Sequence, residues 1–576
     1  MNVLERLRAA FAAAAPAGSD PAAFAAAVRP GTDPKFGDYQ ANGCMAVAKV
    51  LKRNPRELAQ EVARAVDLAS LADAPEVAGP GFLNVRLREA WLGEALGELL
   101  GDEALGLESP AEAKTVVIDY SSPNVAKPMH VGHIRSTVIG ESLARIVAAL
   151  GHRVVRDNHL GDWGTQFGMI LWGWKHGRDE AAFAADPVAE LARLYRSVSA
   201  RIDGGDAALG EAARAETARL HAGDPENRAL WERFMPHCLG ALETLYARLG
   251  VRFDVQLGES FYDSMLADVV RDLEQTGLAR ESEGATVVFV EGFKAPFMVR
   301  KRDGAFTYAT TDLATIKYRQ ERWNPDQVLY VVDHRQADHF KQLFAVARLW
   351  GYDAVDLQHV AFGTILGADR RPFKTRAGDV VGLESLLDEA VSKARAVVDR
   401  IVEEDGADLT VEQRQEVAEV VGLGAIKYAD LSQNRQSDYV FDWDKMMALT
   451  GNTATYMQYA YARIQSIFRK GGTTPEAVRQ RGPAILLTHP AERALGVQLL
   501  RLPEAVELAA AELKPNIVTD YLFDLANQYS TFYENCPVLK AESDGRRDSR
   551  LALCDLTART LRLGLGLLGI DVVDRM

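Results

Sequence analysis

The segment from Thr115 to Gly151 has the clearest pattern of hydrophobic and polar positions in the chain. Thr115-Val-Val-Ile-Asp-Tyr120 is a short, β-branched apolar run, typical of a strand covered on both faces in a parallel sheet. From Ile134 to Leu150 the apolar positions recur every three or four residues, and Gly151 follows where a helix needs a left-handed cap. Val154–Val155 resume a strand pattern. This segment predicts a β-α-β unit whose first loop opens onto a helix N-terminus.

Apolar runs of strand and helix type return after a helical, alanine-rich stretch from about 180 to 250. Asp303-Gly304 is a strong hairpin signal, and Tyr308 to Asp312 leads into a helix for which Thr311 or Asp312 is the expected N-cap. We expect strands at Ala285–Val290, Phe297–Tyr308, Val328–Val332 and Gln358–Phe362, and a helix at Asp338–Trp350. Two β-α-β halves around an insertion predict an α/β Rossmann-like domain with a parallel sheet.

The flanking regions have different patterns. Residues 1–108 predict a small α+β domain, with helices at Val3–Ala15 and Gln40–Val66 and a half-exposed strand at Gly81–Leu87. Beyond residue 382 strand patterns disappear, and an all-helical bundle is expected. Its expected helices are Leu383–Glu404, Val411–Leu431, Asn452–Arg469, Glu492–Leu513, Tyr521–Tyr533 and Asp548–Leu568. The predicted domains are therefore 1–108, 109–381 with an insertion at about 175–300, and 382–576.

Composition narrows the class of protein. A hydrophobic content of 48% with 25% charged residues is that of an ordinary globular chain, and no stretch reaches the ~18 apolar residues that span a bilayer, so no membrane partner is expected. A net charge of −14 argues against a protein that coats nucleic acid indiscriminately, although local basic patches still allow a selective RNA partner. Four widely spaced cysteines predict free thiols in a reducing cytoplasm.

His130 and His133 are the first candidate chemical groups, because they lie at the predicted helix N-terminus. Free N–H groups and the helix dipole favour an anion there, imidazoles add donors to phosphate oxygens, and Gly132 allows a flat ring to approach the backbone. A bare HxxH also arises by chance. A zinc site is a weaker alternative, since no CxxC or third histidine is placed to complete it.

A second glycine motif does not indicate a dinucleotide-binding site. Gly564-Leu-Gly-Leu-Leu-Gly569 matches GxGxxG, but it ends a helical pattern and no strand precedes it. We assign these glycines to helix packing.

The residues around the histidine pair carry a resemblance to a known family. His130-Val-Gly-His133 resembles the HIGH signature of class I aminoacyl-tRNA synthetases, and Asp119-Tyr-Ser-Ser-Pro-Asn-Val-Ala-Lys-Pro-Met-His-Val-Gly-His133 resembles arginyl-tRNA synthetases in particular. Lys374-Thr-Arg-Ala-Gly378 resembles the family's second signature in a form that lacks the second lysine, and Lys127 matches the family's substitute for it. The resemblance covers essentially the whole chain.

This resemblance implies an enzyme that activates arginine with ATP and transfers it to the terminal ribose of a tRNA. Mg²⁺ is expected with the triphosphate, no structural zinc is expected, and arginine activation should require bound tRNA. The resemblance implies that ATP is contacted by Lys127, His130, Gly132, His133 and Lys374. Of these, Lys127, His130, His133 and Lys374 are also the catalytic candidates. The implied arginine-binding residues are Asp119, Ser121, Asn124, Tyr308, Asp312 and Gln336, and the implied supporting residues are His159, Gly161, Asp162 and Gln166.

Within this set Asp312 is the expected partner of the substrate guanidinium, because a planar, permanently charged group with five donors needs a fixed carboxylate. Helix capping is the alternative role for Asp312.

The flanking regions also resemble family domains. Lys35-Phe-Gly-Asp-Tyr-Gln40 and Gly81-Phe-Leu-Asn84 resemble an N-terminal extension that contacts the tRNA elbow, although composition alone equally allows an interaction or dimerisation module. The helical end resembles the DALR anticodon-binding domain. Candidate RNA contacts there are Tyr456, Gln458, Tyr459, Arg463 and Met576. Helical aromatics are usually core, but they also stack on unpaired bases. We expect a monomer.

Two other functions share parts of this pattern. A nucleotidyltransferase with a small-molecule acceptor would use the same histidine loop, but it would not need a long helical third domain. A synthetase-derived RNA-binding or regulatory protein would not need His130, His133, Lys127 and Asp312 together.

Overall fold

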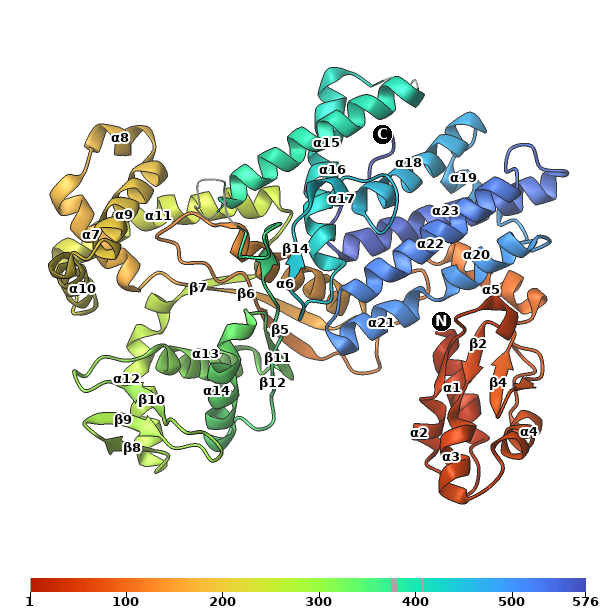
Figure 1. Ribbon diagram of the computed structural model, residues 1–576, viewed down its shortest axis with the longest axis horizontal. Coiled ribbons are helices and arrows are strands. Elements are labelled where there is room, and N and C mark those ends of the chain that lie inside the picture. The colour runs from red at the N-terminus through yellow and green to blue at the C-terminus, as the bar shows by residue number, and fades with distance from the viewer. Residues whose placement is uncertain (1, 374–380, 406–408) are drawn as a thin grey trace.

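The computed structural model describes residues 2–373, 381–405 and 409–576. A parallel sheet lies near the middle of the molecule, with the N-terminal region and a set of inserted helices at opposite ends of the long axis (Figure 1). The helical C-terminal region covers one side of the sheet region (Figure 1). This arrangement confirms the predicted fold class, an α/β domain flanked by a small α+β domain and an all-helical region.

The central sheet has five parallel strands in the order β12-β11-β5-β6-β7, so β5 is the middle strand. The strands are β5 (Thr115–Asp119), β6 (Arg153–Leu160), β7 (Val255–Gly258), β11 (Gln327–Tyr330) and β12 (Asp356–His359). Asp119 is in register with Asp157 on β6 and Tyr330 on β11. The carboxyl ends of the strands therefore form one edge, where ligands bind in open α/β sheets.

Both faces of β5 are buried, which explains its unbroken apolar run. Val116 and Ile118 belong to one core with Ile134 and Val138 of helix α6 (Val131–Ala149). Val117 belongs to a second core, formed with helices α12 (Glu259–Gln275), α13 (Tyr308–Trp323) and α14 (Ala337–Leu349). The sheet thus holds the N-termini of α6, α12 and α13 at fixed places around its carboxyl edge.

A small antiparallel sheet interrupts the chain between α12 and α13. It contains β8 (Ala279–Ser282), β9 (Ala285–Val288) and β10 (Phe297–Arg300), in the order β10-β9-β8. The strand signal predicted over Phe297–Tyr308, broken by a hairpin turn at Asp303-Gly304, forms a strand only to Arg300; Gly304 has a φ of 88° in the predicted turn, and Arg300 pairs with Phe306 beyond it. Tyr308 instead begins α13, so the prediction was too long because it counted the return of the turn as strand.

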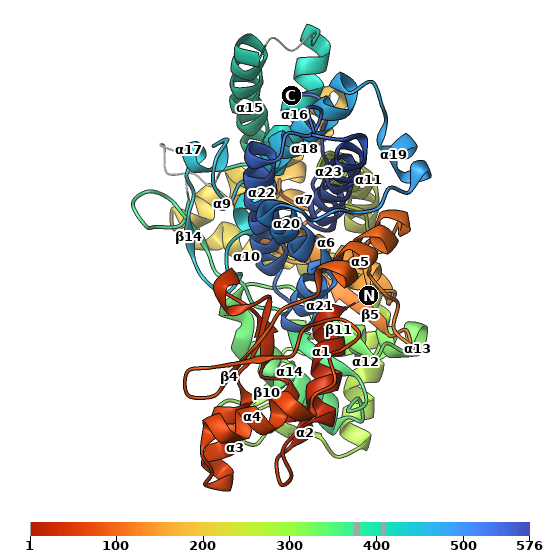
Figure 2. The same ribbon diagram turned by 90° about the vertical axis from the view of Figure 1, so that its right-hand side faces the viewer.

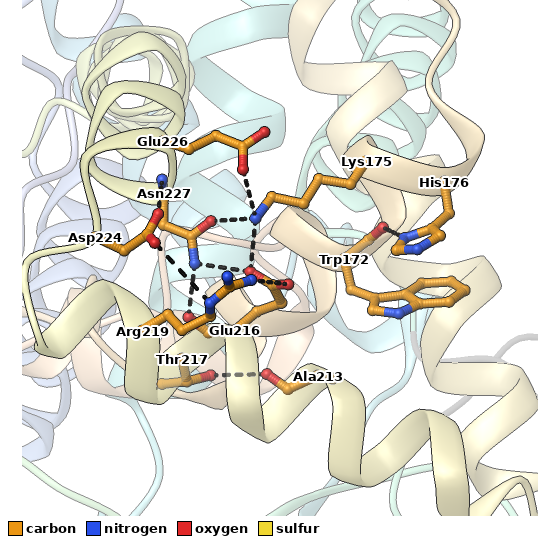
Figure 3. Close-up of polar contacts among 10 residues, drawn as sticks. All are labelled: Trp172, Lys175, His176, Ala213, Glu216, Thr217, Arg219, Asp224, Glu226 and Asn227. Atoms are coloured by element: carbon orange, nitrogen blue, oxygen red, sulfur yellow. Dashed lines mark hydrogen bonds and ion pairs between the residues drawn. The ribbon is translucent and has the colours of Figure 1, made fainter.

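The inserted helices are joined to α7 (Thr165–Gly177) by a buried polar cluster (Figure 3). Lys175 Nζ lies 2.8 Å from Glu216 Oε2 and 2.6 Å from Asn227 Oδ1, and Asn227 Nδ2 donates to Glu216 Oε2 at 2.7 Å. Burial alone would raise the pKa of Glu216, but the bonds from Lys175 and Asn227 lower it on balance. The cluster fixes α10 and α11 against α7. The inserted helices are α8 (Glu180–Ala185), α9 (Pro187–Asp203), α10 (Ala207–His221) and α11 (Pro225–Arg248).

The N-terminal region is a four-stranded antiparallel sheet, ordered β1-β2-β4-β3, with helices around it. The single helix predicted over Gln40–Val66 is wrong, because Gln40 pairs in β2 and Lys52 ends α3 in the left-handed conformation. The elements are α1 (Val3–Ala13), α2 (Pro21–Ala25), β1 (Val28–Pro30), η1 (Pro34–Phe36), β2 (Tyr39–Ala41), α3 (Gly43–Leu51), α4 (Pro55–Ala65), β3 (Glu76–Ala78), β4 (Phe82–Val85) and α5 (Glu89–Gly101).

The C-terminal region is a stack of helices, and its α15–α16 hairpin lies at the opposite end from the N-terminal domain (Figure 2). The helices are α15 (Leu383–Asp405), α16 (Val411–Leu431), α17 (Trp443–Met446), α18 (Ala454–Lys470), α19 (Pro475–Arg481), α20 (Pro490–Leu500), α21 (Leu502–Glu512), α22 (Asn516–Asn535) and α23 (Asp544–Leu567).

Two features of this region differ from the prediction, and a third agrees with it in part. The helix predicted over Glu492–Leu513 divides at Arg501 into α20 and α21. Among the described residues beyond 382 there is one short strand, β14 (Tyr439–Val440), which pairs with β13 (Ile365–Leu366). Of the GxGxxG glycines, Gly564 serves helix packing, because a Cβ there would lie 2.5 Å from Leu522 on α22; Gly566 has open space around it, and Gly569, with a φ of 70°, follows the end of α23.

All four cysteines are buried and free, as expected. Within the described ranges, the helices include none with the length and apolar character needed to cross a membrane.

Candidate active site

His130 and His133 form a capping box at the N-terminus of α6. His130 is the N-cap, and its Nδ1 accepts from the N–H of Gly132 at 3.1 Å. His133 Nδ1 accepts from the N–H of His130 at 3.0 Å, and the two rings lie 4.0 Å apart. Because each Nδ1 is an acceptor, each neutral ring carries its proton on Nε2. The pair therefore combines a fixed helix N-terminus with two Nε2–H donors.

The environment keeps both rings neutral near pH 7. Burial lowers the pKa of His133 to about 3, and the charges of His130 and Lys127 add to this effect. Burial and Lys127 also lower the pKa of His130. Gly132 is required by geometry, because a Cβ there would lie 2.9 Å from His130 Cε1. The ring that approaches the backbone at Gly132 is thus that of His130 itself.

The loop between β5 and α6 begins with a strained turn. Ser121 and Ser122 have φ values of 71° and 42°, a region that costs a residue with a side chain about 1–2 kcal/mol. The N–H of Ser121 donates to Ser136 Oγ at 2.8 Å, and the N–H of Ser122 donates to Asn158 Oδ1 at 3.1 Å. Ser121 Oγ lies 2.8 Å from the hydroxyl of Tyr246. Side chains from three other elements hold this turn in place.

Asp119 ends β5 and belongs to a buried ionic group that the sequence did not predict. Arg319 Nη2 lies 2.6 Å from Asp119 Oδ2, and Arg319 Nε donates to Asp157 Oδ2 at 2.9 Å. Asp119 Oδ1 accepts from Ser122 Oγ at 2.9 Å. Arg319 is fully buried. Both oxygens of Asp119 are therefore already engaged within the protein, in support of the turn.

The two candidate lysines have different positions. Lys127 is half-buried in the loop before α6, and its charge reaches both histidines. Lys374 lies outside the described residues. The described chain resumes beside the histidines: the N–H of Val131 donates to Val381 O at 3.0 Å, and the N–H of Leu383 donates to Met129 O at 3.0 Å. Val381 and Leu383 therefore lie at the N-terminus of α6.

The His159–Gln166 string lies against the same loop. Asn124 forms a parallel bridge with Gly161, where a Cβ would lie 2.4 Å from Asn124 Oδ1. Asp162 caps α12, accepting from the N–H of Ser260 at 2.9 Å. The His159 ring lies 5.5 Å from the ring of Tyr262 on α12 in a tilted contact, and Gln166 lies in the first turn of α7. The string joins the loop after β5 to the start of α12.

A second carboxylate, Glu259, begins α12 and is close enough to Asp312 for their charges to interact. Burial raises the pKa of Glu259 to about 7; His159 opposes this, while the negative charges of Asp162 and Asp312 add to it. Asp312 Oδ2 lies 2.6 Å from His339 Nε2. Burial lowers the pKa of His339, but the bond and charge of Asp312 outweigh burial and raise it. Sequence reasoning missed Glu259 and His339, since neither has a motif; the position of Glu259 directly after a strand was the one available signal.

Asp312 is not a helix cap. The N-cap of α13 is Thr307, which forms a capping box with Thr310, so the predicted cap at Thr311 or Asp312 is wrong. Asp312 follows one turn later, and Tyr308 at the helix start is 67% exposed. Gln336 is exposed at the N-terminus of α14. The structure thus brings Tyr308 and Asp312 to one helix end, with Gln336 at the start of the neighbouring helix.

A separate hollow of about 770 Å³ lies in the C-terminal region. It brings together Tyr459, Arg463 and Met576 of the predicted RNA contacts, and Arg463 lies 4.3 Å from the ring centre of Tyr533. Gln458 is fully buried, and its amide donates to Asp571 O at 2.8 Å. Neither Gln458 nor Tyr456 lines the hollow. Arg575 also lines it, together with three basic residues that sequence reasoning did not select: Arg469, Lys470 and Lys540.

Among the described residues, no group of three or more His, Cys, Asp or Glu side chains could hold a metal ion.

Comparison with known proteins gives one consistent result. Residues 96–443 match the family model of the class I tRNA synthetase (R) catalytic domain, residues 457–576 the DALR anticodon-binding domain, and residues 1–87 the arginyl-tRNA synthetase N-terminal domain. The chain is 45% identical to the arginine–tRNA ligase of Rhodopirellula baltica, with 94% of this chain and 95% of that protein covered. It is 47% identical to that of Cellvibrio japonicus, with 94% of each covered.

Solved structures agree with these matches. The arginyl-tRNA synthetase of Thermus thermophilus superposes with a TM-score of 0.81 at 27% identity and covers 100% of both chains. That of Plasmodium falciparum superposes with a TM-score of 0.80 at 29% identity, covering 95% of this chain and 94% of the other.

Proposed function

The chain belongs to the arginyl-tRNA synthetase family of class I aminoacyl-tRNA synthetases, and from this premise we propose that it is an arginine–tRNA ligase. One observation carries the proposal: Asp312, held by His339 and close enough to Glu259 for their charges to interact, lies at the same sheet edge as the histidine-capped N-terminus of α6. The carboxylates suit a guanidinium, and the helix N-terminus suits a triphosphate.

The amino-acid end of the site selects charge and shape. Asp312 and Glu259 supply two carboxylates for the five donors of a guanidinium. In the free protein His339 occupies Asp312, so an incoming guanidinium replaces one charge-assisted bond with another. Tyr308 and Gln336 lie at the rim. Lysine lacks the planar fork, and citrulline lacks the charge, so each would leave a carboxylate without its partner.

The backbone end of the amino acid faces the strained turn. Ser121 Oγ is engaged with Tyr246 and Thr137, and both Asp119 oxygens are engaged with Arg319 and Ser122. We expect Asn124 and the main chain of the turn to hold the α-amino and carboxylate groups. Asp119 acts there by fixing the turn, and Ser121 by its backbone position.

The phosphate end combines neutral donors with cations. The Nε2–H groups of His130 and His133, the helix N-terminus and Lys127 stabilise negative charge that builds on the triphosphate. Lys374 is proposed as the second cation of this end. Mg²⁺, expected with the triphosphate, would neutralise further charge on the phosphate oxygens when bound. No carboxylate cage on the chain is assigned to it.

The reaction then follows from positioning. The carboxylate of arginine attacks the α-phosphorus of ATP, the bond to pyrophosphate breaks, and the adenylate passes its arginyl group to a hydroxyl of the terminal ribose of the tRNA. No side chain forms a covalent intermediate; orientation and charge stabilisation supply the rate. The hollow around Arg463 and Tyr533 supplies cationic and aromatic groups for unpaired tRNA bases. A monomer in a reducing cytoplasm remains the expected state.

The test is a charging assay with the purified chain, labelled arginine, ATP and the tRNA for arginine. We expect arginyl-tRNA and AMP, and no activation when the tRNA is omitted. Charging with lysine in place of arginine would contradict the carboxylate pocket. Tight tRNA binding without any charging would instead identify a regulatory RNA-binding protein.

A further inference from the structure

A chain of polar contacts leads from the active-site turn into helix α6. Tyr120 directly precedes Ser121, is fully buried and packs on the backbone of α6, where a Cβ on Gly140 would lie 2.2 Å from its ring. The Tyr120 hydroxyl donates to Glu141 Oε2 at 2.7 Å, and Glu141 Oε1 accepts from Arg145 Nε at 2.7 Å. The position of the turn therefore depends on where α6 holds Glu141.

Arg145 joins this chain to the C-terminal region. Its Nη1 donates to Gly566 O at 3.1 Å, at the end of α23, and its Nη2 donates to Gly250 O at 2.9 Å, after α11. Gly569 lies against the same pair: a Cβ there would lie 3.7 Å from Arg145 Nε and 3.9 Å from Glu141 Cγ. Lys427 of α16 also holds Gly569, donating to its carbonyl at 2.6 Å.

From Gly569 the 570–576 segment runs to the RNA hollow. Gln458 of α18 donates to Asp571 O at 2.8 Å, and Arg469 donates to Asp574 O at 3.0 Å. Arg469, Arg575 and Met576 all line the hollow. Seven residues thus connect a wall of the hollow to the glycine that packs on Glu141 and Arg145, a span of at most about 25 Å.

The turn at the other end is suited to respond. Two successive residues in the left-handed region persist only where their surroundings hold them. A small displacement of Glu141 changes the bond to Tyr120, and with it the backbone that receives the amino acid. Fixing the 570–576 segment from the hollow would favour the formed turn.

We propose that Tyr120, Glu141 and Arg145 are positioning residues. They link tRNA bases in the hollow, through the 570–576 segment, to the Ser121–Ser122 turn, and this inference rests on the proposed function. The link makes arginine transfer faster when the hollow is filled. It is a two-ended contact network, so cutting it at either end should give the same defect.

The test uses kcat at saturating tRNA, which removes differences in affinity. Tyr120→Phe and Arg145→Met should each lower kcat about tenfold while the Kd for tRNA stays within twofold. Arg156→Met is the matched control, because Arg156 lies 3.7 Å from the same Glu141 but has no contact with Gly566 or Gly569. It should leave kcat within twofold.

A double-mutant cycle separates a link from mere structural damage. Arg469→Met breaks the contact to Asp574, and the Arg145→Met/Arg469→Met double variant should have the kcat of Arg145→Met alone. Effects that multiply, or an Arg156→Met defect equal to that of Arg145→Met, would overturn the proposal. If the wild-type protein charges no tRNA, the result contradicts the proposed function and not the contact network.

Discussion

In each signature histidine the two ring nitrogens have different roles. Each Nδ1 holds the backbone of α6, and each Nε2–H is left as a donor for a ligand. Low pKa values keep both rings neutral, so they contribute directed hydrogen bonds without a full charge. The positive charge at the phosphate end therefore has to come from lysines, and Lys127 is the one within the described part of the chain.

Lys127→Ala should slow adenylate formation about 100-fold while changing the KM for ATP less than about threefold, since its charge matters most as charge builds in the transition state. Single-turnover AMP formation measures this. Lys114→Ala, at the opposite edge of the sheet, is the control. A proportionate rise in the ATP requirement would place Lys127 in ground-state binding.

The pocket carboxylate Glu259 gives a pH signature. Its pKa is about 7, and only the ionised form pairs with a guanidinium, so the KM for arginine should rise as pH falls below 7, approaching tenfold per unit. His339 acts in the same direction, because protonation strengthens its hold on Asp312. Steady-state kinetics from pH 6 to 8.5 measures the profile.

Glu259→Gln should raise the KM for arginine about 100-fold at pH 8 and flatten the profile. Glu274→Gln, near the other end of α12, should leave both unchanged. An unaltered pH profile in Glu259→Gln would remove Glu259 from the pocket.

Sequence patterns found some of these residues and not others. His130 and His133 were recognised because neighbouring residues fix both their motif and their helix end. Arg319 acts through contacts with strands distant in sequence, so nothing in its own neighbourhood marks it, and the only local signal for Glu259 was its position directly after a strand. Asp119 was assigned to the substrate because the sequence does not show that Arg319 and Ser122 already occupy its oxygens.

At the scale of elements, the N-terminus of α6 is the most constrained feature. Gly132→Ala should lower kcat/KM for ATP at least tenfold, because the added Cβ displaces the His130 ring and weakens the capping box. Gly240→Ala in α11 is the matched control, since no atom lies within 4 Å of its Cβ position and alanine favours a helix. Pyrophosphate release and thermal unfolding measure the two effects. Equal loss of activity in both variants would contradict the steric explanation.

Element type was predictable from periodicity, and element ends were not. The strand β5 and the helices α6, α14 and α16 follow apolar patterns that burial on the sheet or bundle directly requires. The helices predicted over Gln40–Val66 and Glu492–Leu513 each divide in the structure, because apolar spacing continues across the break while the backbone turns at Lys52 and Arg501. Tyr308 begins a helix because Thr307 and Thr310 cap it, a signal hidden inside a β-like run.

At the scale of the whole molecule, the N-terminal domain docks on the C-terminal helices through its Phe-Gly-Asp-Tyr-Gln motif. Asp38 pairs with Arg493 of α20 at 2.7 Å, and the Tyr39 hydroxyl donates to Glu504 of α21 at 2.6 Å. Arg501 lies over the Tyr39 ring and donates to Asp38 O. Contact with the tRNA elbow, implied by resemblance, stays a prediction; the structure assigns Asp38 and Tyr39 of this motif to domain docking.

This docking should depend on pH. Burial raises the pKa of Glu504 to about 7, above the ~4.3 of an unfolded glutamate, so the folded state binds more protons between these values. The contribution is fully present below about pH 4.3 and is lost as pH rises through 7. At pH 8 the loss is at most about 3.7 kcal/mol.

Glu504→Gln should therefore stabilise the protein relative to the unchanged chain at pH 8 and match it at pH 5. Thermal unfolding at both values, with hydrogen exchange of residues 2–108, measures the difference. The control is Glu512→Gln, since Glu512 is exposed on the same helix beside Lys514. An equal offset at pH 5 and pH 8 would contradict a role for Glu504 ionisation.

The central claim is that two carboxylates at the sheet edge select arginine by its charge, and the most direct test is the ratio of kcat/KM for arginine and citrulline in tRNA charging. The two amino acids have the same shape and differ in charge. We expect the unchanged chain to prefer arginine by ~10⁴-fold, and Glu259→Gln to reduce that preference at least 100-fold. Comparable charging with citrulline, or a preference unaffected by Glu259→Gln, would contradict the account.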